Sequence, residues 1–543
     1  MYNSVVNMPF PTNEPNIMYE KGSIHRKKIE EALKKISSQQ VEIPLIIGGK
    51  EIKTGDMGKM IEPHKHANVL GQYHKAGKKE VEMAIQAALK AQNEWELMSF
   101  EQRAAIFLKA AELISTKYRY EINAITMLNQ SKNVFQAEID AACELIDFLR
   151  FNAYFMRQIY EQQPMHNPKG VWNYVQYRPI EGFVFAVTPF NFTAIGGNLP
   201  TAPAMMGNVV VWKPASTAVY ACYKVMRILE EAGLPAGVIN FVPGSGAKVG
   251  DPALQSPDLA GIHFTGSTAT FQNMWKTIGT NIHNYKNYPR IVGETGGKDF
   301  IVAHPSAQVE PLVAAITRGA FEYQGQKCSA ASRAYIPKSL WPQLKPLIER
   351  DVKSLKMGDV RDNTNFVNAV IDKASFENCK AYLQHAKDSD DAEILLGGGA
   401  DDSVGYFVEP TVILAKDPKY KSMVEEIFGP IITIYIYEDE KYEETLKLCD
   451  QTSIYALTGA IFSQDRMATN KALEILRHSA GNFYINDKPT GSIVGQQPFG
   501  GARGSGTDDK AGSYQNLLRW VTTRSIKETF NPPTDYRYPF LEE

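Results

Sequence analysis

The sequence predicts an α/β fold built on parallel sheets that helices cover on both faces. Between residues 183 and 292, short apolar runs alternate with helical segments, and repeated β–α–β units imply parallel strands. The chain has 543 residues, of which 44% are hydrophobic and 22% charged, a composition typical of globular proteins. At roughly 100–200 residues per domain, this length predicts two to four domains. A formal net charge of −2 argues against nucleic acid as a partner.

The first part of the chain is expected to be mainly helical. A polar start leads into a charged helical stretch at 26–35. Apolar residues then recur at helical spacing, which predicts amphipathic helices at 79–94, 102–114 and 137–151. Residues 156–177 are polar and contain two prolines, which predicts a projecting hairpin.

Strands and helices alternate after this excursion. Strands are expected at 183–188, 208–213, 238–242, 261–264 and 290–292, with helices at 218–232 and 270–283. This order predicts a doubly wound, Rossmann-type sheet. A second α/β region is expected over 299–493, with strands at 334–336, 431–437 and 459–462. The last forty residues are rich in loops, with a β-like run at 519–521.

Thirty residues without a charge, 183–212, mimic a membrane span. They contain Pro189, Pro200 and Pro203, so a buried strand, a loop and a packed helix are expected instead, with no membrane partner. The five cysteines show no CxxC pair and no metal-ligand spacing, which favours a reducing compartment and no metal. The first twenty residues contain no Lys or Arg, whereas signal peptides have a basic start and transit peptides are rich in Arg. A cytoplasmic location is therefore expected.

Two glycine-containing turns are candidates for binding a phosphate. In Gly244–Gly250 the third glycine falls one residue late for a dinucleotide fingerprint, so a plain strand-to-helix turn is expected. Gly266 and Ser267 follow a strand and precede a helix, where backbone N–H groups suit a pyrophosphate, although an ordinary helix cap has the same pattern. Lys213, which ends an apolar strand, either reaches a ribose hydroxyl or is the first solvated residue.

Three side chains are candidates for chemistry. Cys328 lies among small residues, and Lys327 with nearby N–H groups is expected to lower its pKa, although most free cysteines are simply buried. Glu294 is a carboxylate at a strand end in a glycine-rich loop, or else a loop residue facing water. Asn191 is either a turn residue or a side-chain donor for an oxyanion.

Six motifs occur in the order found in one family. These motifs are PFNF, a strand ending in KP, FTGS, ETGGKD, GQKCSA and EEIFGP, and together they resemble the aldehyde dehydrogenase superfamily, with a likeness that covers about residues 45 to 505. The resemblance implies that Cys328 is the nucleophile, Glu294 the general base and Asn191 the oxyanion donor, together with the Cys328 N–H. For the cofactor it implies ribose contacts from Lys213 and Glu426, pyrophosphate contacts from Gly266 and Ser267, and further contacts from Thr188 and from Phe428 near the nicotinamide ribose.

The resemblance also implies a division into domains. We expect an aldehyde dehydrogenase-like fold with an N-terminal extension (1–44), a Rossmann-type NAD-binding domain (45–156 and 178–295) and an α/β catalytic domain (296–505). A small β oligomerisation flap would comprise 157–177 and 506–543. A homodimer or higher homo-oligomer is therefore expected.

Longer segments resemble one branch of the superfamily. FNFTAIGGNLPTAPAMMGNVV and AGNFYINDKPTGSIVGQQPFGGARGSGT look like the eukaryote-like L-glutamate γ-semialdehyde (1-pyrroline-5-carboxylate) dehydrogenases. That likeness implies NAD-dependent oxidation of the semialdehyde to L-glutamate, the second step of proline breakdown. Mitochondrial members of the branch carry an import signal, which is not seen here.

The same likeness assigns a substrate site. Glycines in the loop 490–499 let backbone N–H groups form a nest for a carboxylate, and the likeness favours this over a surface turn. The residues expected to bind the substrate are Phe192, Lys327, Ser329, Gly491, Ser492 and Phe499.

Other functions stay open at this level. One alternative is an aldehyde dehydrogenase for another semialdehyde, or with coenzyme A as acceptor, which a hydrolytic Glu294 disfavours. Another is a cysteine hydrolase or acyltransferase, which would want a His base near Cys328, and a third is a non-catalytic scaffold. NAD is favoured by the branch, but Ser216 after the KP motif is small and neutral, so NADP is not excluded.

Overall fold

The central strands of the first of two large sheets, β7 to β10, are fully buried and mostly apolar. The computed structural model describes residues 6–541, so the ends of the expected extension and flap lie outside the described residues. The strand order is β11-β10-β7-β8-β9-β2-β3, and β7 to β11 run parallel. These strands are β2 (Leu45–Ile47), β3 (Lys50–Ile52), β7 (Phe183–Val187), β8 (Val209–Lys213), β9 (Ile239–Phe241), β10 (Leu259–Thr265) and β11 (Arg290–Glu294).

The order of these strands reverses at the centre of the sheet. From β7 the chain winds outward through β8 and β9 on one side, then returns to β10 and β11 on the other. In such sheets ligands bind at the carboxyl ends of the strands, where the order reverses. The predicted doubly wound sheet is therefore confirmed, and it points to a site beside the ends of β7 and β10.

Helices and a small sheet surround the first large sheet. The helices are α1 (Ile24–Ser37), α2 (Lys78–Leu97), α3 (Phe100–Leu113), α4 (Arg119–Gln130), α5 (Val134–Ala137), α6 (Leu145–Tyr160), α7 (Thr193–Met205), α8 (Val219–Ala232), α9 (Gly246–Gln255), α10 (Thr268–Thr280) and α17 (Tyr514–Leu518). A π-helical turn, Glu138–Glu144, joins α5 to α6. The small sheet has the order β1-β5-β4 and consists of β1 (Val41–Ile43), β4 (Met57–Glu62) and β5 (Lys65–His74).

The charge-free segment 183–212 forms the centre of this lobe. It contains strand β7, a loop and helix α7, as predicted, and all but the last residue of β8. Among residues 6–541 no helix combines the length and apolar character needed to cross a bilayer.

The second large sheet forms a separate lobe. Its order is β14-β17-β18-β13-β12-β20-β21, parallel except for the edge strand β14. The strands are β12 (Asp299–Ala303), β13 (Ala331–Pro337), β14 (Ala392–Leu396), β17 (Thr411–Ala415), β18 (Ile431–Tyr437), β20 (Thr458–Phe462) and β21 (Asn482–Ile485). Its helices are α11 (Val309–Phe321), α12 (Trp341–Ser354), α13 (Lys373–Lys387), α14 (Lys421–Val424), α15 (Tyr442–Gln451) and α16 (Arg466–Ile475).

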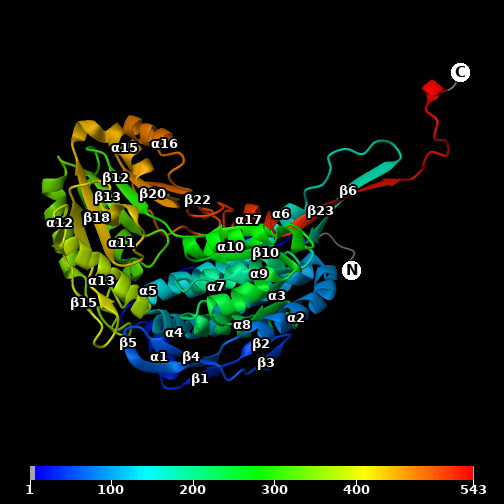
Figure 1. Ribbon diagram of the computed structural model, residues 1–543, viewed down its shortest axis with the longest axis horizontal. Helices are drawn as coiled ribbons and strands as arrows, with labels where there is room; N and C mark the ends of the chain where they lie inside the picture. Colours follow the sequence, from blue (N-terminus) through cyan, green and yellow to red (C-terminus); the bar gives the residue numbers. More distant parts are fainter. Residues whose placement is uncertain (1–5, 542–543) are drawn as a thin grey trace.

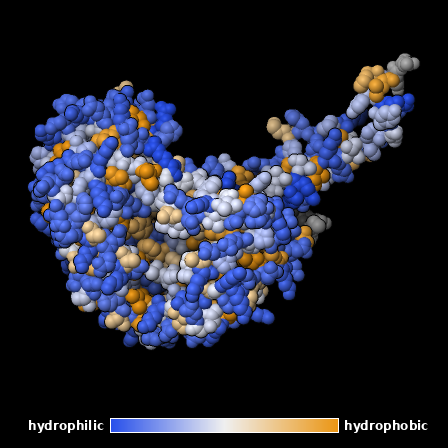
Figure 2. Space-filling view, viewed as in Figure 1, coloured by the Kyte–Doolittle hydropathy of each residue, from blue (hydrophilic) through white to orange (hydrophobic). Residues whose placement is uncertain are grey.

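The two lobes meet along one side, and Figure 1 shows the second lobe, coloured yellow and orange, beside the first. Each lobe has its own apolar core: one cluster surrounds the first sheet, and two clusters flank the second. Two short ribbons complete this region, β15 (Ala400–Asp401) with β16 (Phe407–Val408), and β19 (Tyr455–Ala456) with β22 (Ala502–Arg503). On the face in Figure 2, less hydrophilic residues show in the recess between the lobes.

A two-stranded arm projects from the first lobe and differs from the predicted hairpin. Strand β6 (Val171–Pro179) pairs antiparallel with β23 (Val521–Thr529), so the partner strand comes from the end of the chain (Figure 1). Helix α6 continues through the expected domain boundary at 156. Residues 506–520, predicted to belong to the flap, instead lie against the first sheet, where the buried Trp520 ring packs on His263. The predicted β-like run at 519–521 is therefore too early and too short.

Candidate active site

Cys328 and Glu294 come from different lobes and meet between them. Glu294 ends β11 of the first sheet, while Cys328 precedes β13 of the second. The Cys328 thiol donates to Glu294 Oε1 across 3.7 Å. The thiol is only 8% exposed, and burial, followed by the nearby Glu294 carboxylate, raises its pKa well above the usual range. Burial also raises the pKa of Glu294 to about 8.

These two shifts describe one coupled pair. A buried carboxylate beside a buried thiol disfavours the form in which both are ionised. Near neutral pH the thiol and most of the Glu294 carboxyl therefore hold their protons, and Glu294 Oε1 accepts the hydrogen bond of the thiol.

Asn191 lies between β7 and the start of α7, beside the thiol. Its side-chain amide donates to the Gln326 carbonyl across 3.1 Å, two residues before Cys328. Asn191 and Cys328 line the same cavity. The sequence-predicted catalytic residues are thus brought together, with the Asn191 amide held next to the cysteine segment.

A cavity of about 760 Å³ opens at the carboxyl ends of the first sheet's strands, and we call it the strand-end cavity. It lies where the strand order reverses, which is the expected place for a ligand in this kind of sheet. Every residue that the sequence predicted to bind a cofactor lines it, namely Thr188, Lys213, Gly266, Ser267, Glu426 and Phe428. Asn191 and Cys328 lie at one end of this set.

Local structure explains how the first-lobe residues of this cavity are placed. Thr188 follows β7, and its hydroxyl accepts a hydrogen bond from the Trp212 indole. Lys213 ends β8, and burial lowers its pKa to about 8. Ser267 caps α10 by accepting from the Thr270 N–H, so the free N–H groups of the first turn face the strand ends.

Two residues of the second lobe close the strand-end cavity. The Glu426 carboxylate accepts from the Gly297 N–H at 2.9 Å and lies against Gly296, where an added Cβ would be 2.1 Å from Glu426 Oε2. Burial raises the pKa of Glu426 to about 7. Phe428 has φ of +59° and packs edge-on against Phe190.

These residues fit a dinucleotide. The start of α10 offers N–H groups for a pyrophosphate, and Lys213 and Glu426 offer a donor and an acceptor for ribose hydroxyls. Gly246 and Gly250 of α9 also line the cavity, and a Cβ added to either would meet no atom within 4 Å. The turn at Gly244–Gly250, which the sequence analysis interpreted as a plain strand-to-helix turn, therefore forms part of the cavity wall. Its signal was two glycines spaced one turn apart at a helix start.

A second cavity, of about 380 Å³, also has Cys328 in its wall. We call it the loop cavity because residues 490–496 form much of its wall. All the sequence-predicted substrate residues line it, namely Phe192, Lys327, Ser329, Gly491, Ser492 and Phe499. Cys328 lines both cavities, so its sulfur lies where the two meet.

Lys327 does not activate the cysteine as expected. Its ammonium group pairs with the buried Glu322 carboxylate at 3.0 Å, which neutralises it. The pKa of Cys328 is raised by burial and by surrounding carboxylates, not lowered by this lysine. The expectation was wrong because the side chain of Lys327 is held by a partner five residues earlier in the chain.

Residues 490–499, which we call the anchor loop, are held partly by Ser329 of the second lobe. The Ser329 hydroxyl shares a 2.7 Å hydrogen bond with Thr490, and Gly491 has φ of +97°, which favours glycine. Gly495 also needs to be glycine, because an added Cβ would lie 2.0 Å from the Phe151 ring. The loop is therefore closely packed between the two lobes.

Several wall residues of the loop cavity were missed in the sequence. Glu144, the last residue of the π-helical turn, lines the cavity, and burial raises its pKa to about 8. Asn13, Glu14 and Asn16 of the N-terminal segment also line it. These residues belong to no motif, and they are far from Cys328 along the chain, so the sequence did not indicate that they lie near it.

Comparisons with known proteins agree with this geometry. The aldehyde dehydrogenase family model matches residues 52–526. Delta-1-pyrroline-5-carboxylate dehydrogenases are 57% identical over 537 residues in Dictyostelium discoideum, covering 98% of this chain and 96% of that protein, and 50% identical over 531 residues in Homo sapiens, covering 98% and 94%. Both carry the word mitochondrial in their names.

A solved structure is equally similar. Delta-pyrroline-5-carboxylate dehydrogenase from Mycobacterium tuberculosis, bound with NAD, superposes with a TM-score of 0.96 at 51% identity over 99% of each chain. The match of the family model over most of the chain, together with these relatives, settles the family. This chain belongs to the aldehyde dehydrogenase family.

Proposed function

We propose that this protein oxidises L-glutamate γ-semialdehyde to L-glutamate with NAD, as in the second step of proline catabolism. The observation that carries the proposal is the place of Cys328, which lines both the strand-end cavity and the loop cavity. An aldehyde held in one cavity meets the sulfur on one side, and a dinucleotide in the other meets it on the opposite side. The relatives' names agree with this activity.

Cys328 acts as the nucleophile in this scheme. Its buried thiol has a raised pKa, so it gives up its proton as the sulfur adds to the aldehyde carbon. Solvent in the cavities takes that proton, and Glu294 Oε1, 3.7 Å from the sulfur, is a second acceptor, so the addition does not require Glu294. The addition places a negative charge on the former aldehyde oxygen, and the Asn191 amide beside the cysteine segment is the donor for it.

Oxidation and release of the product follow. When bound, the nicotinamide cofactor accepts hydride from the carbon attached to sulfur, which leaves a thioester. Glu294 then removes a proton from water, and the resulting hydroxide adds to the thioester carbon. The thiolate leaves and takes the proton from Glu294, and the carboxylic acid so formed loses its own proton to solvent. The carboxylate product forms and Cys328 is restored.

The loop cavity suits the amino-acid end of the substrate. Gly491 and Ser492 provide backbone N–H groups and a hydroxyl for the carboxylate, while Glu144 lies in the same wall as a partner for the ammonium group. Phe192 and Phe499 line the space between, against the aliphatic middle. A simple aldehyde leaves these polar groups without a ligand.

We also propose the predicted division of labour among the parts. The NAD-binding domain (45–156 and 178–295), which contains the first sheet, would hold NAD, and the catalytic domain (296–505) would supply the cysteine. The projecting arm of β6 and β23 supports a homo-oligomer, because a two-stranded ribbon has little core of its own and Trp172 and Phe530 are exposed. Sedimentation velocity over a range of concentrations tests the assembly.

The cytoplasmic location stays a prediction. Relatives from several organisms are named mitochondrial, and these names do not support a cytoplasmic location. Cell fractionation, with the activity followed in each fraction, decides between the two compartments.

Steady-state kinetics with paired substrates tests the activity. We expect kcat/KM for glutamate semialdehyde to exceed that for butanal by about two orders of magnitude or more, since each hydrogen bond to the charged carboxylate contributes ~1.5–3 kcal/mol. NAD and NADP are compared in parallel, with NAD expected to be preferred. Equal efficiency for the two aldehydes would reject the substrate and leave an aldehyde dehydrogenase of another specificity.

A cysteine hydrolase is the rival from another class. Such an enzyme wants a His base beside its thiol, and among the described residues no His lines the strand-end or loop cavity. Turnover without formation of NADH would be its signature.

A further inference from the structure

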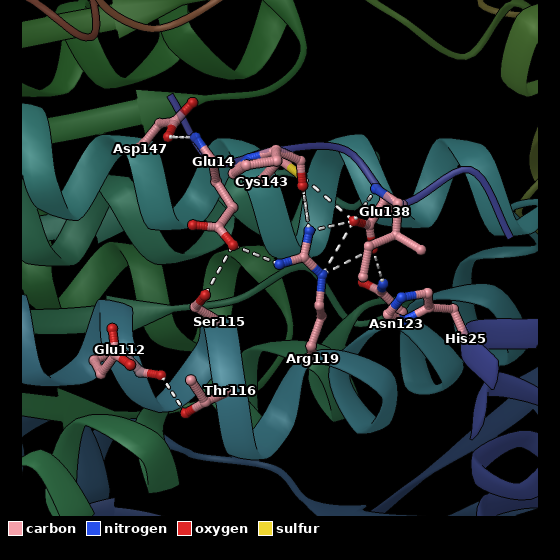
Figure 3. A network of polar contacts seen from close by, with 12 residues as sticks. Glu14, His25, Glu112, Ser115, Thr116, Arg119, Asn123, Glu138, Cys143 and Asp147 are labelled. Carbon is pink, nitrogen blue, oxygen red and sulfur yellow. Dashed lines mark hydrogen bonds and ion pairs between the residues drawn. The ribbon is translucent and has the colours of Figure 1, made fainter. Parts of the chain in front are cut away.

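The N-terminal segment lies across the loop cavity. Residues 13–19, which we call the strap, precede α1 and run beside the π-helical turn and α6 (Figure 3). Three of them, Asn13, Glu14 and Asn16, line the cavity together with the anchor loop. The strap is therefore a wall of the same space that holds the proposed substrate.

Glu14 fixes the strap to the helices beneath it. Its carboxylate accepts from Ser115 at 2.8 Å and pairs with Arg119 and with Arg150, which lies at 2.6 Å. Figure 3 shows Glu14 pointing from the strap toward Ser115 and Arg119. Burial alone would raise the pKa of Glu14, but these partners lower it, so the carboxylate is ionised.

A second carboxylate holds the other end of the strap. Glu138, fully buried, accepts from the Ile17 N–H at 2.9 Å and from the Tyr19 hydroxyl at 2.8 Å. Arg119 pairs with Glu138 as well as with Glu14, so one guanidinium joins both ends of the strap (Figure 3). These buried contacts hold residues 14–19 in one place.

Asn13 connects the strap to the anchor loop. Its amide nitrogen donates to the Val494 carbonyl and to Asp147 Oδ2, each at 2.8 Å. Its amide oxygen accepts from Gln496 at 2.9 Å. One side chain thus joins the anchor loop, which carries Gly491 and Ser492, to helix α6.

We propose that the strap is a specificity-determining part of the active site, in which Asn13 positions the anchor loop for the amino-acid end of the substrate. The inference rests on the proposed function, because it concerns how that substrate is recognised. Asn13 is a positioning residue: it holds the loop through Val494 and Gln496. The reacting aldehyde lies near Cys328 and does not depend on this contact.

The consequence is a selective effect on substrates. A loop whose N–H groups are held in place binds a carboxylate without first losing freedom of motion, and release of the loop makes binding weaker. Butanal has no carboxylate to bind there. Its turnover is therefore expected to be insensitive to the contact.

Asn13→Ala is the direct test, with the same protein assayed on two aldehydes at saturating NAD. We expect kcat/KM for glutamate semialdehyde to fall about tenfold, mainly through KM, the size of one lost net hydrogen bond. For butanal we expect a change within about twofold. The affinity for L-glutamate, measured by calorimetry, falls by about the same factor as for the semialdehyde.

Two further variants keep the test decisive. Gln496→Ala, which removes one of the contacts from the loop side, is expected to act in the same direction but less strongly. Asn7→Ala is the matched control, because Asn7 is an exposed asparagine of the same segment that does not line the cavity. It should leave both substrates unaffected.

The outcomes separate this inference from the proposed function. Equal losses for the two aldehydes in Asn13→Ala, or no loss for either, would overturn the role of the strap. If Asn13→Ala does not fold, the same comparison of kcat/KM for the two aldehydes is made with Gln496→Ala, and it decides the question. A wild-type protein that turns over butanal as efficiently as glutamate semialdehyde would instead reject the proposed function, and the strap's role with it.

Discussion

At the scale of single residues, Cys328 is the group on which the chemistry depends. Cys328→Ala removes the atom that adds to the aldehyde but leaves the wall of the strand-end cavity almost intact. We expect aldehyde oxidation to fall by at least about a hundredfold, because the sulfur of Cys143, the other cysteine in the wall of the loop cavity, contacts Arg119 and Glu138 instead of Glu294. NAD binding, followed by calorimetry, should stay close to wild type. Oxidation retained above about a hundredth of the wild-type rate would contradict the assignment of the nucleophile.

Glu294→Gln separates the two halves of the reaction. The amide keeps the size of the side chain but cannot accept a proton from water, so thioester hydrolysis should stop. We expect one rapid burst of NADH per active site followed by a very low steady rate, measured by stopped-flow absorbance. Loss of the burst itself would show that Glu294 is needed already when the thiol gives up its proton, as the 3.7 Å contact allows.

The raised pKa of Glu294 predicts the pH dependence of turnover. Burial raises it to about 8, and the carboxylate acts as a base only when ionised. Below this pKa the ionised fraction falls about tenfold per pH unit, so kcat should rise with pH and level off above about 8. Measurement of kcat from about pH 6.5 to 9 at saturating substrates tests the sign. A kcat that does not change over this range would contradict hydrolysis by Glu294.

The sequence could predict residues that carry a motif and could not predict their partners. Glu294, Asn191 and the cofactor set were named from short motifs, and the structure brings them to one place. Asn13 was not foreseen, because its contact with Asp147 joins residues 134 apart. For Lys327 the sequence predicted a residue that does line the loop cavity, but it did not predict that Glu322 pairs with the ammonium group.

At the scale of elements, the start of α7 depends on one buried ion pair. Asp140 accepts from the Thr193 and Ala194 N–H groups at the N-terminus of α7, and it pairs with Lys132 at 2.7 Å. Lys132 also lies 4.2 Å from the centre of the Phe192 ring, which lines the loop cavity. The pair therefore fixes both the helix start and a substrate-facing side chain.

Asp140→Asn tests this arrangement. The variant leaves the fully buried Lys132 without its ionic partner, and loss of one member of a buried pair costs ~3–5 kcal/mol. We expect the free energy of unfolding, measured in urea, to fall by about this amount. Asp56→Asn is the control, since Asp56 pairs with Lys75 at the surface and its loss should change stability very little. Equal free energies of unfolding for the two variants would contradict the claim that the start of α7 depends on Asp140.

The predictability of each element follows from its burial. Strands such as β7 and β8, in which every residue is buried, were predicted close to their bounds because they are continuous apolar runs. Strand β23 was largely missed, since only its first residue is buried and its polar side chains show no apolar alternation. Its partner β6 has no fully buried residue either. A strand that has no core beneath it leaves no pattern in the sequence.

At the scale of the whole molecule, the site exists only because two lobes meet. The first sheet brings Glu294 and the strand-end residues, while the second lobe brings Cys328, Glu426 and the anchor loop. Each lobe can be predicted from its own sequence pattern. Their contact is set by side chains that are distant in the chain, and only the family resemblance indicated it beforehand.

The arm is the part of the molecule that we propose to hold the copies of an assembly together. Its two strands pair over nine residues, from Val171–Thr529 to Pro179–Val521, and Trp172 is 51% exposed on it. An exposed ribbon of this kind is marginally stable alone, and assembly would cover its apolar side chains. We therefore expect Trp172→Glu to lower the sedimenting mass of the assembly at micromolar concentration.

The matched control places the same charge on the other lobe. Val404 is 56% exposed in the loop between β15 and β16, so Val404→Glu should leave the sedimenting mass unchanged. Both variants should keep the unfolding transition of the two sheets, because neither side chain belongs to a core. A Trp172→Glu protein with the wild-type mass would show that the arm does not hold the copies together at this residue. A monomeric wild type would reject the assembly itself, while the cysteine, the base and both cavities, which one chain supplies in full, would still be present.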